Sequence, residues 1–228
     1  MTASPSLLLI RQKYTPYGGA ERFVERAMAA LVEQGVSLSL LTREWQGAAE
    51  GVEVIPCRPF YLGRLWRDKS FHRAACGKVE ELAPSLVQSH ERISCCDIYR
   101  AGDGLHGQWL HHKKRASGPL TRLALDWSPY HRYVLQAEER LFTSPRLKAV
   151  ICNSYMVQKE IRQQFKLPVA MLPVIYSGVD SERFHPRLRQ ARQRVREAWG
   201  IPQQAVVFLF VGSGFKRKGM DISLKTFA

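Results

Sequence analysis

Short apolar runs alternate with segments of helical spacing along most of this chain. Runs rich in Leu, Val and Ile, of a length typical of strands, lie at residues 6–10, 36–42, 52–55, 86–89, 98–101, 147–153, 169–174 and 205–211. Apolar residues three or four positions apart predict helices at residues 17–34, 65–82, 129–142, 154–165, 187–199 and 220–228, whereas residues 105–125 are mixed. Because strand, helix and strand follow one another within about forty residues, the pattern predicts an α/β fold with a parallel sheet.

Residues at several expected helix ends agree with this pattern. Gly35 follows the first predicted helix, in the usual C-terminal role of glycine. Ser128 precedes Pro129, and Ser154 precedes the helix expected at 154–165. Serine just before a helix can accept a hydrogen bond from its first turn, so both serines are predicted to be N-caps.

The composition indicates a globular protein with a large excess of positive charge. The 228 residues are 45% hydrophobic and 24% charged, and 34 Lys and Arg residues against 20 Asp and Glu residues give a net charge of +14. Such an excess favours a polyanionic partner, which can be nucleic acid, an anionic membrane face or a phosphate-bearing substrate. No nucleic-acid recognition motif accompanies the charge, and its dispersed distribution fits an anionic bilayer at least as well.

Other classes of protein are not indicated. The sequence has no run of 18 apolar residues typical of a membrane span, and its first residues are not expected to be a signal peptide. Five cysteines, an odd number, argue against a disulfide framework and for a reducing cytoplasm. Cys95 and Cys96 lack the spacing of zinc ligands relative to His90 and His106, so no metal site is predicted.

A basic, glycine-rich loop follows the last apolar run. Gly212, Gly214 and Gly219 allow the backbone to approach an anion, and residues 216–218 add three cations before a predicted helix N-terminus. The spacing is not that of a dinucleotide fingerprint. Gly214 and Gly219 have the spacing of a P-loop, but Met220 and Asp221 stand where a P-loop needs lysine and serine or threonine, so no P-loop is predicted. By itself, this loop is either a phosphate site or a solvated basic loop.

Two further segments have motif-like spacing. Gly18 and Gly19 join the first predicted strand to its helix at the ligand edge of a parallel sheet, although a plain tight turn has the same spacing. Residues 177–186 read Ser-Gly-Val-Asp-Ser-Glu-Arg-Phe-His-Pro. Asp180 and Pro186 are expected to shape a turn there.

In this order, the three segments resemble motifs of the retaining, nucleotide-sugar-dependent family-4 glycosyltransferases, which have two Rossmann-like domains in the GT-B fold. The matches are a Gly-Gly-x-Glu turn, an Asn-Gly-Val-Asp connector in which Ser177 replaces asparagine, and an Arg-Lys-Gly loop. Residues 97–103 also resemble an Asp-Val-Tyr-x-Ala-x-Asp segment of members that add glucose to the lipopolysaccharide core. The donor-binding residues implied by the resemblance are Gly18, Gly19, Arg217 and Lys218.

The resemblance also implies a domain organisation. Residues 1–168 are expected to form a complete, acceptor-side Rossmann-like domain, and residues 169–228 the connector and the first strand, loop and helix of the nucleotide-sugar-binding domain. Family members take most donor contacts from later parts of that domain. The chain is therefore expected to be a truncated and poorly active form.

Asp103 is the candidate catalytic residue. It follows the predicted strand at 98–101 and lies between two glycines. By resemblance it lies near the acceptor hydroxyl, where it can orient that group or accept its proton. The structural alternative is an Asx-turn residue. His90 and Glu91, which follow another predicted strand, are acceptor-side candidates.

The function implied by the resemblance is transfer of a hexose, with retention, from a nucleotide sugar to a glycan. The donor is expected to be UDP-glucose and the acceptor a lipopolysaccharide core or a related lipid-linked glycan. No cofactor or metal is expected, because fixed cations can stabilise the leaving diphosphate. The positive surface is expected to hold a cytoplasmic enzyme at the anionic inner membrane, and no particular oligomeric state is implied. The alternative is a non-catalytic basic module that binds anionic membrane or nucleic acid.

Overall fold

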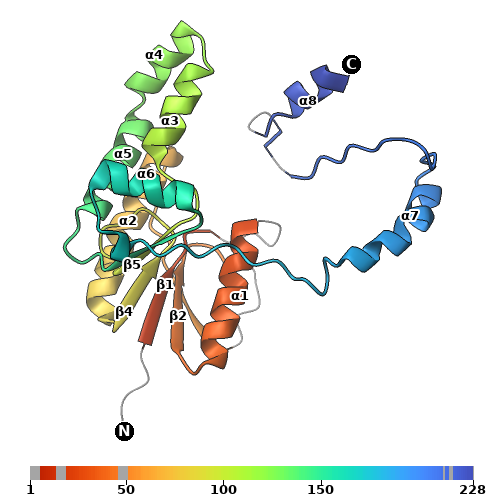
Figure 1. Cartoon of the computed structure of the whole chain (residues 1–228). Helices are drawn as coiled ribbons and strands as arrows, with labels where there is room; N and C mark the ends of the chain where they lie inside the picture. The colour runs from red at the N-terminus through yellow and green to blue at the C-terminus, as the bar shows by residue number, and fades with distance from the viewer. Residues whose placement is uncertain (1–5, 14–18, 46–50, 213, 216–217, 228) are drawn as a thin grey trace. The chain divides into compact units, whose positions relative to one another are not determined.

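The computed structural model describes residues 6–13, 19–45, 51–212, 214–215 and 218–227 (Figure 1). The chain divides into two compact units, Met1–Gly178 and Val179–Ala228, and each is described by itself. The first unit extends past the expected boundary at residue 168 and includes the start of the connector. None of the helices in the described ranges is both long and apolar enough to cross a membrane.

A six-stranded parallel sheet forms the centre of the first unit, in the order β3-β2-β1-β4-β5-β6. Its strands are β1 (Ser6–Ile10), β2 (Ser37–Thr42), β3 (Val52–Pro56), β4 (Leu86–Ser89), β5 (Ile98–Ala101) and β6 (Ala149–Cys152). β1 lies between β2 and β4, with Leu7 opposite Leu38 on one side and Leu86 on the other. The predicted α/β fold with a parallel sheet is confirmed.

Helices connect the strands and pack on both faces of the sheet (Figure 1). They are α1 (Gly19–Glu33), α2 (Gly63–Leu82), α3 (His106–Arg115), α4 (Pro119–Trp127), α5 (Pro129–Phe142) and α6 (Tyr155–Phe165). Successive side chains of a strand point to opposite faces. In β1, Leu7 and Leu9 therefore join one core cluster with Val24 of α1, whereas Leu8 and Ile10 join the larger cluster beneath α2, α5 and α6.

The predicted helix ends are confirmed. Ser128 Oγ accepts a hydrogen bond from His131 N at 3.4 Å, and Ser154 Oγ accepts one from Val157 N at 3.3 Å. Gly35, just after α1, has a φ of +77°, a conformation that favours glycine. The mixed segment at 105–125 contains most of two helices, α3 and α4.

Two expected elements differ in type. Residues 169–174 do not form a strand: Val169–Met171 is a 3-10 turn, and Val174 makes a single bridge to Cys152 at the end of β6. The cause is Pro173, which accepts a hydrogen bond from Cys152 N at 2.9 Å but has no N–H to extend a ladder. The helix expected at 187–199 is a 3-10 helix, Pro186–Ala191, followed by α7 (Arg192–Ala198).

The strand expected at 205–211 is absent from the described part of the second unit, although α8 (Met220–Phe227) forms. Val206, Leu209 and Val211 are 79%, 82% and 77% exposed. A strand is stable only when neighbouring strands satisfy its backbone, and no neighbour is described here. Residues 205–211 therefore have the composition of a strand but no paired neighbour in the part of the second unit that the structure describes.

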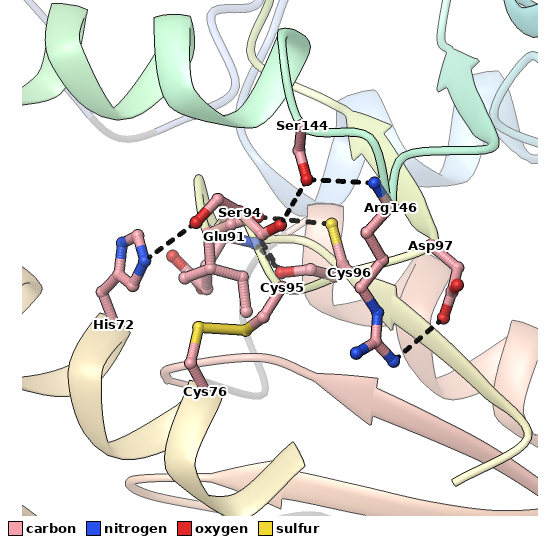
Figure 2. The surroundings of a disulfide bond; sticks show 11 residues. His72, Cys76, Glu91, Ser94, Cys95, Cys96, Asp97, Ser144 and Arg146 are labelled. Carbon is pink, nitrogen blue, oxygen red and sulfur yellow. Dashed lines mark hydrogen bonds and ion pairs between the residues drawn. A yellow bond between two sulfur atoms is a disulfide. The ribbon is translucent and has the colours of Figure 1, made fainter. Parts of the chain in front are cut away.

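The structure contains a disulfide bond between Cys76 of α2 and Cys95, in the loop between β4 and β5 (Figure 2). The expectation of cysteines without disulfides is therefore wrong for this pair, although Cys57, Cys96 and Cys152 are free and buried. The odd count could not reveal it, because the two cysteines are 19 positions apart in sequence and are brought together only by the packing of α2 beside this loop.

A buried carboxylate joins three parts of the first unit. Glu138 of α5 has a side chain only 2% exposed, and its Oε1 accepts hydrogen bonds from Arg92 Nε at 2.9 Å and from His106 N at 2.7 Å. Arg92 also donates to Gly104 O at 3.1 Å. The segment from Gly104 to His106 is thus fixed to α5 and to the β4–β5 loop through one ion pair.

We expect Glu138→Ala to lower the free energy of unfolding by about 3 kcal/mol, because it leaves Arg92 partly buried without its counter-charge. Chemical denaturation monitored by circular dichroism measures the change. The matched control is Glu139→Ala, at the next position on α5 but exposed, which should change stability by less than about 0.5 kcal/mol. Equal effects of the two substitutions would contradict the role given to the ion pair.

The second prediction concerns residues 206–211, whose amides make no backbone hydrogen bond among the described residues. Hydrogen exchange measured by mass spectrometry should be fast there and slow in β1, whose amides lie in the sheet. Slow exchange at 206–211 in the isolated chain would show that this segment is paired after all.

Candidate active site

The carboxyl ends of β1 and β4 form the crevice of the sheet at which ligands are expected. The strand order runs outward from β1 through β2 and β3, and outward from β4 through β5 and β6. Open α/β sheets bind ligands where this order reverses, beyond the carboxyl ends of the strands. Gln12 follows β1 there, and the predicted acceptor-side residues His90 and Glu91 follow β4. The structure thus brings both candidates to the crevice.

Glu91 bridges the two strand ends. Its Oε1 accepts hydrogen bonds from Gln12 N at 2.9 Å and from Arg11 Nη1 at 3.4 Å. Its own backbone is held by Ser89, whose Oγ accepts from Glu91 N at 3.0 Å and donates to Glu91 O at 2.8 Å. These bonds fix the carboxylate in place, so Glu91 shapes the crevice with one oxygen already engaged.

A positively charged pocket of about 280 Å³ lies beside Glu91. It is lined by Arg11, Gln12, Lys13, Arg43, Glu44, Tyr61, Arg67 and Glu91. Four cations against two carboxylates favour an anionic group in this pocket. These cations are not among the site residues predicted from the sequence. For Arg11 and Arg43 a signal existed, because each directly follows a buried strand, and Lys13 lies two residues further on; Arg67 lies in α2, and only the fold brings it to the pocket.

His90 is held uncharged. Its N donates to Ile10 O at 3.0 Å, and its Nε2 lies 3.3 Å from Gln88 Nε2. Burial, assisted by the charges of Arg100 and Arg11, lowers the pKa of His90 to about 3. The ring is therefore neutral at pH 7 and a weak base, suited to hydrogen bonding rather than to proton removal.

Asp103 lies at a bend after β5, and its side chain is exposed. Both neighbouring glycines are anchored: Asn153 Nδ2 donates to Gly102 O at 2.7 Å, and Arg92 donates to Gly104 O at 3.1 Å. Within the described ranges, the Asp103 carboxylate accepts no hydrogen bond, so it is not engaged in an Asx turn. The bend thus presents an open carboxylate next to the positive charges of Arg92 and Arg100.

Arg100 is a buried residue of the site region that the sequence did not reveal. Its guanidinium lies 3.7 Å from the ring centroid of Phe23 in α1, and its Nη2 lies 3.5 Å from Ser177 Oγ in the connector. A Cβ at position 102 would lie 2.7 Å from Arg100 Nη1, so a larger residue than Gly102 would require the Arg100 side chain to shift. Arg100 therefore links α1, β5 and the connector behind Asp103.

The predicted donor residues are only partly described. Gly19 is the first residue of α1, whereas Gly18 and Arg217 lie outside the described residues. Lys218 is exposed and belongs to the second unit, where a Cβ on Gly212 would lie 2.0 Å from Lys218 Nζ. Gly212 thus permits the lysine to fold back over the loop backbone. The connector turn is present, because Asp180 Oδ1 accepts a hydrogen bond from Arg183 N at 2.9 Å.

Solved structures share this fold. The crystal structure of WaaG, a glycosyltransferase involved in lipopolysaccharide biosynthesis, superposes with a TM-score of 0.81 at 20% identity, covering 96% of this chain and 58% of that one. A glycosyltransferase from Rickettsia africae gives a TM-score of 0.53 at 12% identity, covering 89% of this chain and 51% of that one. The first unit is the α/β domain expected of a GT-B protein.

Sequence relatives agree with the structural likeness. Lipopolysaccharide glucosyltransferase WaaG of Escherichia coli K12 is 22% identical over 218 residues, which cover 95% of this chain and 56% of that protein. D-inositol 3-phosphate glycosyltransferase of Corynebacterium urealyticum is 24% identical over 235 residues, which cover 92% of this chain and 53% of that protein. The chain spans about half the length of the curated relatives it matches. The sequence model of Glycosyltransferase Family 4 matches residues 17–183, and the chain belongs to this family of glycosyltransferases.

Proposed function

We propose that this chain is the acceptor-side part of an enzyme that transfers glucose from UDP-glucose, with retention, to a lipopolysaccharide core or a related lipid-linked glycan. The observation that carries the proposal is the edge of the sheet at the carboxyl ends of β1, β4 and β5, where Glu91, His90 and the exposed Asp103 come from consecutive connections of one family-4 domain. The similarity to the lipopolysaccharide glucosyltransferase WaaG of Escherichia coli supports the choice of sugar and acceptor. A non-catalytic module is not favoured, because the family match spans residues 17–183.

Each part of the crevice has a distinct role in this proposal. Asp103 orients the acceptor hydroxyl or accepts its proton, and neutral His90 hydrogen-bonds the acceptor sugar. The pocket beside Glu91 attracts anionic groups of the substrates. The leaving diphosphate is stabilised by donor residues and helix N-termini, with fixed cations supplying the positive charge. The donor residues are Gly18, Gly19, Arg217 and Lys218.

We further propose that α3 and α4 hold a cytoplasmic enzyme against the anionic inner membrane. Leu120, Leu123 and Trp127 recur at helical spacing on α4 and are 83%, 57% and 71% exposed, and α4 has no buried residue. The last turn of α3 carries His112, Lys113, Lys114 and Arg115. An apolar stripe beside a cationic segment is typical of a helix that lies in a membrane interface.

Asp103→Asn tests the catalytic role. In the chain together with any further domain encoded with it, transfer of radiolabelled glucose from UDP-glucose to a glucose-free lipopolysaccharide core should have a kcat reduced by about 100-fold or more. The KM for UDP-glucose should be nearly unchanged, because Asp103 faces the acceptor. The control, Glu139→Gln, changes an exposed carboxylate of α5 and should leave kcat unaffected. Absence of transfer by the unmodified protein would refute the proposed donor or acceptor, and full activity of Asp103→Asn would exclude its catalytic role.

Leu120→Asp tests the membrane surface. Co-sedimentation should show binding to vesicles that contain phosphatidylglycerol, weaker binding to phosphatidylcholine vesicles, and a loss of about tenfold in affinity on substitution, since an apolar contact is removed and a negative charge added. Leu62→Asp, at a leucine that is 76% exposed near the start of α2, is the matched control and should bind normally. An equal loss of affinity in both variants would argue against this surface. Equal binding to phosphatidylglycerol and phosphatidylcholine vesicles would argue against it as well.

A further inference from the structure

The β4–β5 loop, residues 90–97, is where the acceptor-side candidates meet the disulfide. His90 and Glu91 lie at its start, and Cys95 lies near its end. Figure 2 labels Glu91 and Cys95. Its last residue, Asp97, is fixed independently: Val87 N donates to its Oδ2 at 2.9 Å, and Lys148 Nζ lies 3.1 Å from its Oδ1. The two ends of the loop therefore belong to the sheet, and its middle depends on other contacts.

Within the loop, Ser94 and Cys95 are the residues tied to α2, whereas Arg92 pairs with Glu138 of α5 and Ile93 and Cys96 are buried in the core. The covalent tie is the bond from Cys95 to Cys76, and beside it Ser94 Oγ lies 3.3 Å from His72 Nε2 (Figure 2). On the other side, Ser144 Oγ donates to Ser94 O at 2.8 Å. Without the sulfur–sulfur bond, Ser94 keeps two hydrogen bonds, each worth about 1 kcal/mol, and the buried side chains of Ile93 and Cys96 still anchor the loop on either side of it.

The same loop positions the candidate catalytic bend. Arg92 is three residues from Cys95, pairs with Glu138, and donates to Gly104 O next to Asp103. A displacement of the loop at Cys95 therefore reaches Glu91 and, through Arg92, the backbone at Asp103. The disulfide lies outside the crevice but is connected to it through a few residues.

Solvent can reach this bond. Cys76 and Cys95 both line a groove of about 1430 Å³ along α2 and α5. The chain's other cysteines, Cys57, Cys96 and Cys152, are buried, and burial raises the pKa of Cys96 to about 12 and that of Cys152 to about 11. Thiols with such pKa values are unreactive at neutral pH. Cys76 and Cys95 are therefore the cysteines placed for exchange.

We propose that Cys76 and Cys95 form a reversible redox modification site. A dithiol reductant reduces their disulfide, and the β4–β5 loop is well ordered when the bond is formed and more mobile when it is reduced. A thiolate of the dithiol attacks one sulfur, and the other cysteine leaves as a thiolate that takes up a proton. The second thiol of the reductant then closes its own disulfide and releases the remaining cysteine thiol. Two electrons pass from the dithiol to the protein. In a reducing compartment, a solvent-accessible disulfide of this kind is transient and suited to sensing.

Two amides report on the loop directly. Glu91 N donates to Ser89 Oγ at 3.0 Å, and Ile93 N donates to Glu91 O at 2.8 Å, so both bonds depend on the fold of the loop. Asp97 N donates to Val87 O at 2.9 Å and reports on the sheet instead. Hydrogen exchange at these amides therefore separates a loosened loop from a loosened sheet, and it needs no substrate.

The experiment compares air-oxidised chain with chain treated with dithiothreitol. Peptide mapping should find Cys76 linked to Cys95, and reduction should accelerate exchange at Glu91 and Ile93 by about tenfold or more, with Asp97 and β1 unchanged. Cys95→Ser should exchange rapidly with or without dithiothreitol. The matched control, Cys57→Ser, removes a free thiol and should keep the response. The proposal would be overturned by absence of the linked peptide or by no response at Glu91 and Ile93. Equal acceleration throughout β1 would also overturn it, because the bond would then stabilise the whole domain rather than the loop.

The effect on transfer rests on the proposed function and is measured separately. Dithiothreitol should lower glucose transfer by the unmodified protein, whereas Cys95→Ser should be slow under both conditions. Transfer that is insensitive to dithiothreitol would overturn the coupling of this bond to the crevice. An exchange response without any glucose transfer would refute the proposed donor or acceptor and support the redox site by itself.

Discussion

The backbone pairing of β1 with β4 joins the two halves of the sheet, and the position of the site depends on it. Leu7 to Ile10 are matched one by one along β4, and the sheet order places β2 and β3 on one side and β5 and β6 on the other. Beyond the strands, the pairing continues as hydrogen bonds from His90 N to Ile10 O and from Gln12 N to Glu91 Oε1. His90 and Glu91, the predicted acceptor-side residues, are thus held by the same register that builds the core.

The Arg92–Glu138 ion pair fixes the loops that lie beyond the ends of the strands. Removing two charges from water costs several kcal/mol per ion, and a good pair only offsets that cost. Glu138 Oε2 has no partner in the described part of the chain, so the offset is incomplete. What the pair achieves is position: one carboxylate oxygen holds Arg92 of one loop and His106 N at the start of α3. The bend at Asp103 lies beyond the end of β5, so the ion pair of Arg92 with Glu138, rather than strand pairing, fixes its position.

The sequence predicted the elements whose stability is local or follows from one buried face. The six sheet strands are apolar runs, and Ser128 and Ser154 capped their helices as expected. Features that depend on residues distant in the sequence could not be predicted from it. The strand at 205–211 needs a neighbour, the disulfide needs α2 beside the β4–β5 loop, and Arg100 becomes a site residue only when Phe23 and Ser177 close around it. His90 and Glu91 could be proposed because they directly follow a strand, and in a parallel sheet such positions share one edge.

The three acceptor-side candidates differ in what their side chains can still do. A group that orients or deprotonates a hydroxyl needs an available lone pair of sufficient basicity. Glu91 Oε1 is already engaged by Gln12 N and Arg11, and burial holds the pKa of His90 at about 3. Asp103 is exposed, and its carboxylate accepts no hydrogen bond from the described residues. Its backbone is nevertheless fixed on both sides, through Gly102 and Gly104. A fixed backbone with an uncommitted carboxylate is what a catalytic role requires, and among these three residues Asp103 combines the two.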